Sequence, residues 1–190
     1  LRTKEWETGA FRSLVDRWFY SLEEEVLARP GFSSGDPALL AERVAEEVGT
    51  LLEARLNAVS ATQPQFAAAL RGIHKARATN NVVVSEGLLS WLMGQPNVSA
   101  DVKRAAGLKG DLDHFAAGGF LRGLLELLKQ TGRAGFLLVL DEVETIQRMR
   151  ADSREKSLNA LRQLIDELIG GRYPGLYILM TGTPAFFDGP

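Results

Sequence analysis

The stretch Phe136-Leu137-Leu138-Val139-Leu140-Asp141-Glu142 decides the fold, because five consecutive apolar residues run directly into two carboxylates. A strand that is apolar on both faces belongs inside a parallel sheet covered by helices, since a strand with one wet face would alternate apolar and polar residues. In such sheets, ligands bind beyond the carboxyl ends of the strands. The sequence therefore predicts a buried strand that presents Asp141 and Glu142 at a ligand-binding edge.

A helix and a second apolar strand follow this stretch. Asp152 with Glu155 three residues later resembles a capping box, and Gly170-Gly171 provides the stop signal. The stripe expected to be buried on this helix consists of Leu158, Leu161, Leu164, Ile165 and Leu168. The run Leu176 to Met180 is again continuously apolar, so the whole segment predicts a βαβ unit with parallel strands.

The second strand ends in Thr181-Gly182-Thr183-Pro184. The carboxyl ends of neighbouring parallel strands meet at one edge of a sheet. The sequence therefore predicts that Thr181 and Thr183 lie towards Asp141 and Glu142. Taken alone, this stretch is typical of an ordinary strand-ending turn.

The first 130 residues show amphipathic helical patterns separated by turn signals. The expected helices are 9–28, a second beginning at Asp36-Pro37 and reaching at least Leu56, 65–78, 81–93, a short one from Ser99, and 114–130. The chain is therefore expected to be α/β, with a helical N-terminal half and a βαβ unit at its C-terminal end.

Composition narrows the class of protein. The chain has 190 residues, 45% of them hydrophobic, a net charge of −2, no cysteine and two histidines, His74 and His114. It can therefore form a real core but no thiolate metal site, and two separated histidines do not make one. No apolar run approaches the ~20 residues of a membrane helix, and no signal peptide is apparent, so we expect a cytoplasmic protein without membrane contact.

Four apolar or small residues followed by Asp-Glu form the Walker B pattern of P-loop nucleoside triphosphatases. In that interpretation Asp141 holds Mg²⁺, usually through its water shell, and Glu142 polarises the attacking water. In AAA-like and STAND-like ATPases a polar residue placed like Thr181 or Thr183 serves as sensor 1 and contacts the γ-phosphate or that water. The alternative is a buried strand that ends in a solvated acidic turn.

The sequence resembles the P-loop ATP-binding domain proteins of BREX-type phage-defence systems. The resemblance rests on 138–144, on 181–187 and on 9–18, and it extends over nearly the whole chain. It implies an ASCE-type P-loop NTPase fold, ATP with Mg²⁺, Asp141 as the magnesium-organising acid, Glu142 as the catalytic base, and Thr181 or Thr183 as the sensor. It also implies two parts, a helical region 1–113 inserted in or packed on the ATPase core, and a core portion 114–190.

One departure from that family is serious, because no Gly-x-x-x-x-Gly-Lys-Ser/Thr phosphate loop occurs in the 190 residues. We therefore expect a fragment of an ATPase of antiviral defence, whose incomplete sheet binds ATP poorly without the missing loop. An exposed strand edge would favour self-association, and other defence proteins are candidate partners. Arg148, Arg150, Arg154 and Arg172 are candidate arginine fingers.

Two other functions remain open at the level of sequence. The first is a helical interaction or scaffold module that needs no nucleotide and keeps the acidic strand only as architecture. The second is a DNA-binding module that would use six basic residues if they shared one face. Those residues are Arg71, Lys75, Arg77, Lys103, Arg104 and Lys109.

Overall fold

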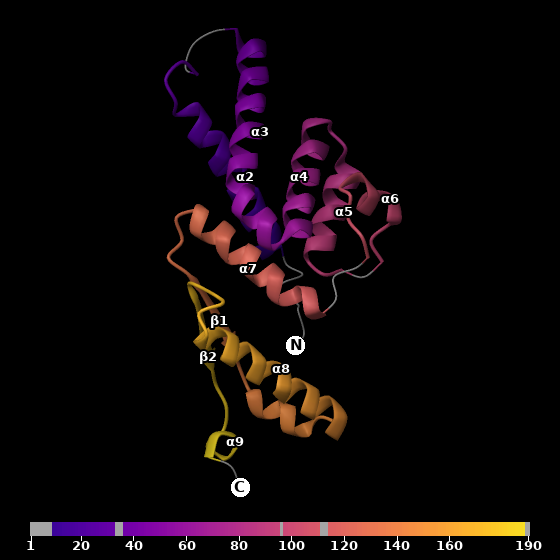
Figure 1. Ribbon diagram of the computed structural model, residues 1–190, viewed down its shortest axis with the longest axis vertical. Helices are drawn as coiled ribbons and strands as arrows, with labels where there is room; N and C mark the ends of the chain where they lie inside the picture. Colours follow the sequence, from indigo (N-terminus) through magenta and orange to yellow (C-terminus); the bar gives the residue numbers. More distant parts are fainter. Residues whose placement is uncertain (1–8, 33–35, 96, 111–113, 189–190) are drawn as a thin grey trace. The chain divides into compact units, whose positions relative to one another are not determined.

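The computed structural model describes residues 9–32, 36–95, 97–110 and 114–188 (Figure 1). They belong to two compact units, residues 1–131 and 132–190, and each is considered by itself. The first unit is helical, and the second contains a two-stranded parallel sheet. The predicted helix-rich α/β class is confirmed at this level, while the predicted division of the chain after residue 113 remains a prediction.

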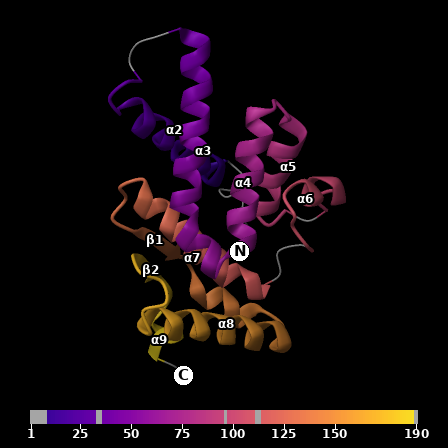
Figure 2. The ribbon, with the colours of Figure 1, turned by 45° about the horizontal axis from the view of Figure 1, so that its top comes forward.

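The helices of the first unit lie where the sequence predicts them. They are α2 (Ala10–Leu27), α3 (Pro37–Thr62), α4 (Pro64–Ala78), α5 (Val82–Leu92), α6 (Ala100–Ala105) and α7 (His114–Gln130). Helix α3 begins at the predicted signal, since the Asp36 side chain accepts a hydrogen bond of 3.0 Å from the Ala38 N–H. Figure 2 shows α4, α5 and α6 lying together on one side of the unit.

Helices α2, α3 and α7 share a core around one tryptophan. Trp18 is fully buried, and its indole N–H donates to Gln130 Oε1 at 3.0 Å. The amide of Gln130 in turn donates to the main-chain oxygen of Arg55 at 3.2 Å. This buried tryptophan is satisfied by a residue 112 positions away, so the three helices are tied together by polar geometry as well as by apolar packing.

His74 lies half-buried on α4 and stacks on Phe19 of α2, with ring centroids 6.0 Å apart. Burial lowers the pKa of His74, opposed by the charges of Glu23 and Glu53 and assisted by Arg77. These contacts give His74 a structural role in the packing of α4 on α2.

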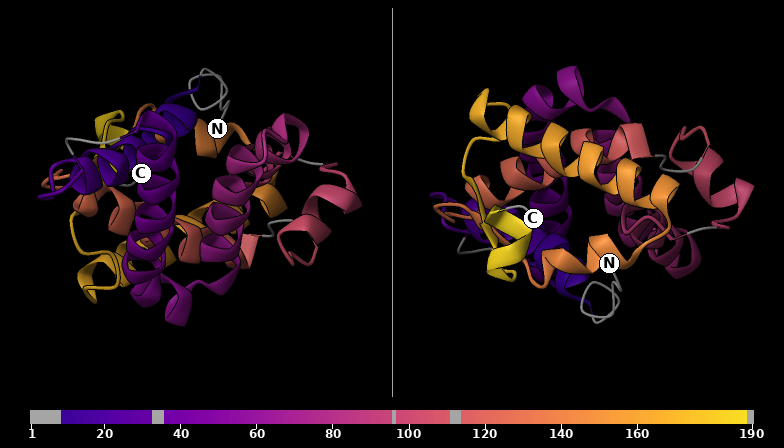
Figure 3. Two further views of the ribbon diagram at one scale, coloured as in Figure 1. Left: turned by 90° about the horizontal axis from the view of Figure 1, so that it is seen from above. Right: turned by 90° about the horizontal axis from the view of Figure 1, so that it is seen from below.

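The second unit contains β1 (Phe136–Leu140), the 3₁₀ helix η1 (Val143–Arg148), α8 (Ala151–Ile169), β2 (Leu176–Met180) and the short α9 (Pro184–Asp188). β1 and β2 pair in parallel, with Phe136 opposite Leu176 and Leu140 opposite Met180. The predicted strand–helix–strand unit is confirmed. Figure 3 shows α8 as the long helix of this unit and α9 beside the C-terminal end.

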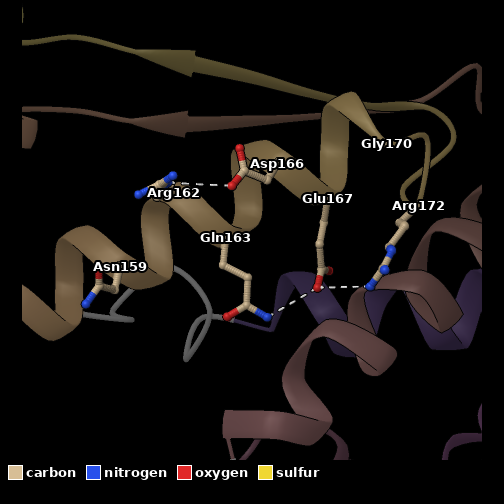
Figure 4. A pocket seen from close by; sticks show the side chains of 7 residues that line it. All are labelled: Asn159, Arg162, Gln163, Asp166, Glu167, Gly170 and Arg172. Carbon is tan, nitrogen blue, oxygen red and sulfur yellow. Dashed lines mark hydrogen bonds and ion pairs between the residues drawn. The ribbon is translucent and has the colours of Figure 1, made fainter.

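One face of this sheet is open, contrary to the prediction of strands buried on both faces. Leu137 is 59% exposed and lies opposite Tyr177 at 67%, and Val139 at 49% lies opposite Leu179 at 50%. The other face is half-buried, and α8 lies beside the strands (Figures 1 and 4). The difference arises because a single helix of this unit lies against the sheet in the described residues, so it can cover one face only.

Two predictions about α8 are wrong. Its N-cap is Arg150, no side-chain cap is formed, and Asp152 already lies in the first turn, so there is no capping box. The predicted stripe is not fully buried either, since Leu158 is 40% exposed and the remaining four residues are half-buried. Packing against two strands covers less of a helix than packing against a full sheet does. The 3₁₀ helix η1 was not predicted.

No described helix has the length and apolar character that crossing a membrane requires.

Acidification should weaken the first unit through His74. A histidine whose folded-state pKa lies below that of the unfolded chain stabilises the fold only while neutral, so stability falls as pH drops through about 6.5 towards the folded pKa. We expect the melting temperature, followed by circular dichroism, to fall less between pH 7.5 and pH 5.5 in His74→Gln than in the wild type. Equal falls in the two proteins would contradict this.

Replacing Gly135 by alanine should weaken the pairing of β1 with β2 at their amino ends. A Cβ at this position would lie 2.5 Å from the main-chain oxygen of Gly175, which accepts the Phe136 N–H at 2.8 Å. We expect Gly135→Ala to destabilise the second unit by about 1–3 kcal/mol, seen as faster amide exchange at 136–140. The control is Arg133→Ala in the same turn, and tryptophan fluorescence monitors the first unit. Unchanged exchange in Gly135→Ala would refute the prediction.

Candidate functional site

The carboxyl ends of β1 and β2 bring Asp141 and Thr181 into contact. Main-chain bonds continue past the strands, from Thr181 N–H to Leu140 O at 3.0 Å and from Val143 N–H to Thr181 O at 3.0 Å. The Thr181 hydroxyl donates to Asp141 Oδ1. The two segments lie 40 residues apart in the sequence, and the parallel pairing alone brings them to one edge.

Glu142 occupies a constrained backbone position at this edge. Its φ of 53° and ψ of 47° lie in the left-handed region, which costs a non-glycine residue roughly 1 kcal/mol. Its N–H donates to Asp141 Oδ1 at 3.0 Å and lies 3.3 Å from Thr181 Oγ1. The Glu142 side chain is exposed. Strain of this kind concentrates at functional sites, where the surrounding structure holds it in place.

Thr183 is placed differently from Thr181. It is exposed and directly precedes α9, with its main-chain oxygen accepting the Phe186 N–H at 2.9 Å. In the described part of the chain, its hydroxyl forms no hydrogen bond with Asp141 or Glu142. Of the two threonines predicted at this edge, Thr181 is therefore the one that contacts the acidic strand end.

Glu144 also belongs to this edge, and it was absent from the predicted site. It lies in η1, and its Oε2 is buried without a hydrogen-bond partner in the described structure. A Cβ added to Gly182 would lie 3.0 Å from this oxygen, so the carboxylate sits against the turn that carries Thr181. The signal was present in the sequence as a third acid in Asp-Glu-Val-Glu, but η1, which turns it towards Gly182, was not predicted.

The oxygen atoms at this edge suit a hard cation that keeps most of its water. Mg²⁺ is commonly held by one or two carboxylates together with substrate phosphates. Asp141 is exposed, with Glu142 beside it and the Thr181 hydroxyl as an orienting neighbour. Among the described residues, no group of three or more histidine, cysteine or acidic side chains could hold a metal ion by itself. The donors therefore fit a shared magnesium site rather than a closed protein cage.

A pocket of the second unit lies along α8 and the turn after it, away from the strand-end edge (Figure 4). It measures about 510 Å³. Its charges are largely paired with each other, since Arg162 contacts Asp166 at 3.7 Å and Arg172 contacts Glu167 at 3.4 Å. Arg172 precedes β2 and therefore lies near the amino ends of the strands, away from Asp141.

The other candidate arginines are not drawn together at the strand ends by any contact in the described structure. Arg148 and Arg150 are exposed, and Arg154 donates to the main-chain oxygen of Gln147 at 3.4 Å. Which of them, if any, acts on a neighbouring subunit stays a prediction.

Three of the six basic residues considered for DNA binding are engaged with acids. Arg71 binds Glu53 at 2.7 Å, which holds the pKa of that carboxyl below its usual range. Arg104 contacts Asp101 at 2.9 Å, and Arg77 forms an ion pair with Asp16. These pairs neutralise much of the positive charge that phosphate binding would use.

Comparison with known proteins gives one family. Neither a curated protein nor a solved structure gives a significant match to the chain. The family described as BREX system ATP-binding protein BrxC/D matches residues 1–190. Because the match spans the full sequence, the chain belongs to the BREX system ATP-binding protein BrxC/D family.

Proposed function

We propose that these residues form the Mg²⁺-coordinating and sensor part of a P-loop ATPase that acts in BREX-type phage defence. The observation that carries the proposal is the contact of Thr181 with Asp141 at the carboxyl ends of two parallel strands. An acid and a hydroxyl at the carboxyl ends of parallel strands are suited to a cation that is bound to phosphate. Family membership supports ATP as the nucleotide.

The residues at this edge have distinct roles in this proposal. Asp141 holds Mg²⁺ through its water shell, and Thr181 orients the Asp141 carboxylate while serving as the sensor near the γ-phosphate. Glu142, exposed and held in the left-handed region, acts as the general base that orients the attacking water. Bound Mg²⁺ would neutralise charge that develops on the phosphate oxygens.

The phosphate cradle must come from residues outside these 190, because the sequence contains no phosphate loop. Backbone N–H groups of such a loop supply most direct contacts to a nucleotide. We therefore propose that the chain is part of a longer ATPase, with a helical first region and an ASCE-type core, and that by itself it binds ATP weakly.

We propose that the chain acts in the cytoplasm together with other proteins of the BREX defence system, because it belongs to a BREX family. Contact with DNA would have to come from a partner or from local charge, because the net charge is −2.

Nucleotide binding should depend on Asp141 and Thr181. We expect isothermal titration calorimetry to show Mg²⁺-dependent ATP binding by the chain extended upstream through its phosphate loop, and weak or no binding by the 190 residues. Asp141→Ala and Thr181→Val should each weaken binding by the extended chain at least tenfold, because they remove the metal-organising carboxylate or its orienting donor.

Thr183→Val is the matched control and should leave affinity unchanged, since in the described structure the Thr183 hydroxyl forms no hydrogen bond with Asp141. If the extended chain bound no Mg²⁺-ATP, the ATPase proposal would fail and the nucleotide-independent scaffold would replace it. If Asp141→Ala bound as tightly as the wild type, the acidic strand would be architecture only.

We also propose self-association of the 190 residues through the open sheet. Within the described residues β1 and β2 pair only with each other, so each has an unpaired edge, and one face exposes Leu137 and Tyr177. Light scattering should show a mass above that of the monomer. Replacing both Leu137 and Tyr177 by lysine should lower this mass, because it places positive charges on the open face. A strictly monomeric wild type would rule this out.

A further inference from the structure

The Glu144 carboxylate is held in an unfavourable place. Its Oε2 is screened from solvent and accepts no hydrogen bond in the described structure. Desolvating a polar atom without a partner costs about 1–3 kcal/mol, and more for a charged one. A residue chosen only for stability would not be an acid at this position.

The neighbours of this oxygen are those of the turn after β2. A side chain at Gly182 would meet Glu144 Oε2 at 3.0 Å, Val143 Cγ2 at 3.0 Å and Phe187 Cε2 at 3.2 Å. A side chain at 182 would therefore force these neighbours to shift by a few tenths of an ångström, and the carboxylate lies directly against this turn.

Donors for this oxygen are present in the same turn. In the described residues, the main-chain N–H groups of Gly182 and Thr183 form no hydrogen bond within the protein. Both residues are exposed. An unpaired buried acceptor therefore lies against the turn that carries these two N–H groups.

We infer that Glu144 is a positioning residue, which fixes the turn 181–184 when nucleotide binds by accepting a hydrogen bond from Gly182 or Thr183. The inference rests on the proposed function. Thr181 begins this turn and contacts Asp141, so fixing the turn holds the sensor hydroxyl beside the metal-organising carboxylate. Glu144 Oε2, which has no hydrogen-bond partner in the described structure of the nucleotide-free chain, then accepts a hydrogen bond when nucleotide is bound.

The test uses the chain extended upstream, with Glu144→Leu, Glu144→Gln, and the exposed acid Glu155→Gln as control. Without nucleotide, Glu144→Leu should melt no lower than the wild type, because an apolar group of similar volume replaces an unpaired acceptor. Its affinity for Mg²⁺-ATP should fall about tenfold, the scale on which removal of an orienting partner acts. Glu144→Gln, which keeps an acceptor oxygen, should recover part of this loss.

Amide exchange at Gly182 and Thr183 gives a readout independent of ATP hydrolysis. Mg²⁺-ATP should slow exchange at one of these positions in the wild type and in Glu155→Gln, but not in Glu144→Leu. A lower melting temperature of nucleotide-free Glu144→Leu, or protection equal to that of the wild type, would overturn the inference.

The two proposals fail in different ways. If the wild type binds Mg²⁺-ATP, Asp141→Ala does not, and Glu144→Leu matches the wild type, the positioning role alone is wrong. If wild type and Asp141→Ala behave alike, the magnesium role of Asp141 is wrong and the inference about Glu144 falls with it.

Discussion

The in-register parallel pairing of β1 with β2 is the constraint on which the candidate site depends. It places Leu140 opposite Met180, so the residues that follow each strand emerge at the same edge. The main-chain bonds between Thr181 and both Leu140 and Val143 then fix the distance between the two chain segments. An antiparallel pairing would put Asp141 and Thr181 at opposite ends, and no local feature of either segment could restore the contact.

The two units differ in how many of their apolar side chains are buried. The first unit has a continuous core that includes Trp18, Phe66, Leu70 and Trp91, each almost fully buried. In the described part of the second unit, the buried apolar residues are Val143, Tyr173 and Leu176, and every residue of α8 is at least partly exposed. The helical unit is thus stabilised by its own buried core, whereas one face of the sheet stays exposed to solvent. That contrast agrees with a site completed by further residues.

The sequence was most informative where a local pattern has a single physical solution. The cap at Asp36 and the proline after it predicted the start of α3, and two uninterrupted apolar runs predicted the parallel strands. The contact between Thr181 and Asp141 followed from topology. The failures have tertiary causes, since the open face at Leu137 depends on how many elements cover the sheet. Glu144 escaped prediction because its burial depends on η1 and on a close approach to Gly182.

The strand-end site combines strain, an unpaired carboxylate and an exposed acid within a few residues. Glu142 lies in the left-handed region, Glu144 lacks a partner in the described structure, and Asp141 has its carboxylate turned to the Thr181 hydroxyl. The first two of these features cost stability, and strain of this kind concentrates at functional sites, which supports the proposed ligand-binding edge.

The central claim is that a divalent cation with its nucleotide binds at the edge shared by Asp141 and Thr181. Mn²⁺-ATP can replace Mg²⁺-ATP as a paramagnetic probe of the labelled chain extended upstream. The account predicts the strongest broadening at the amide signals of 141–145 and 181–184 within the 190 residues, with weaker broadening at 159–172. Broadening centred on α8, or none at the strand ends while nucleotide is bound, would contradict it.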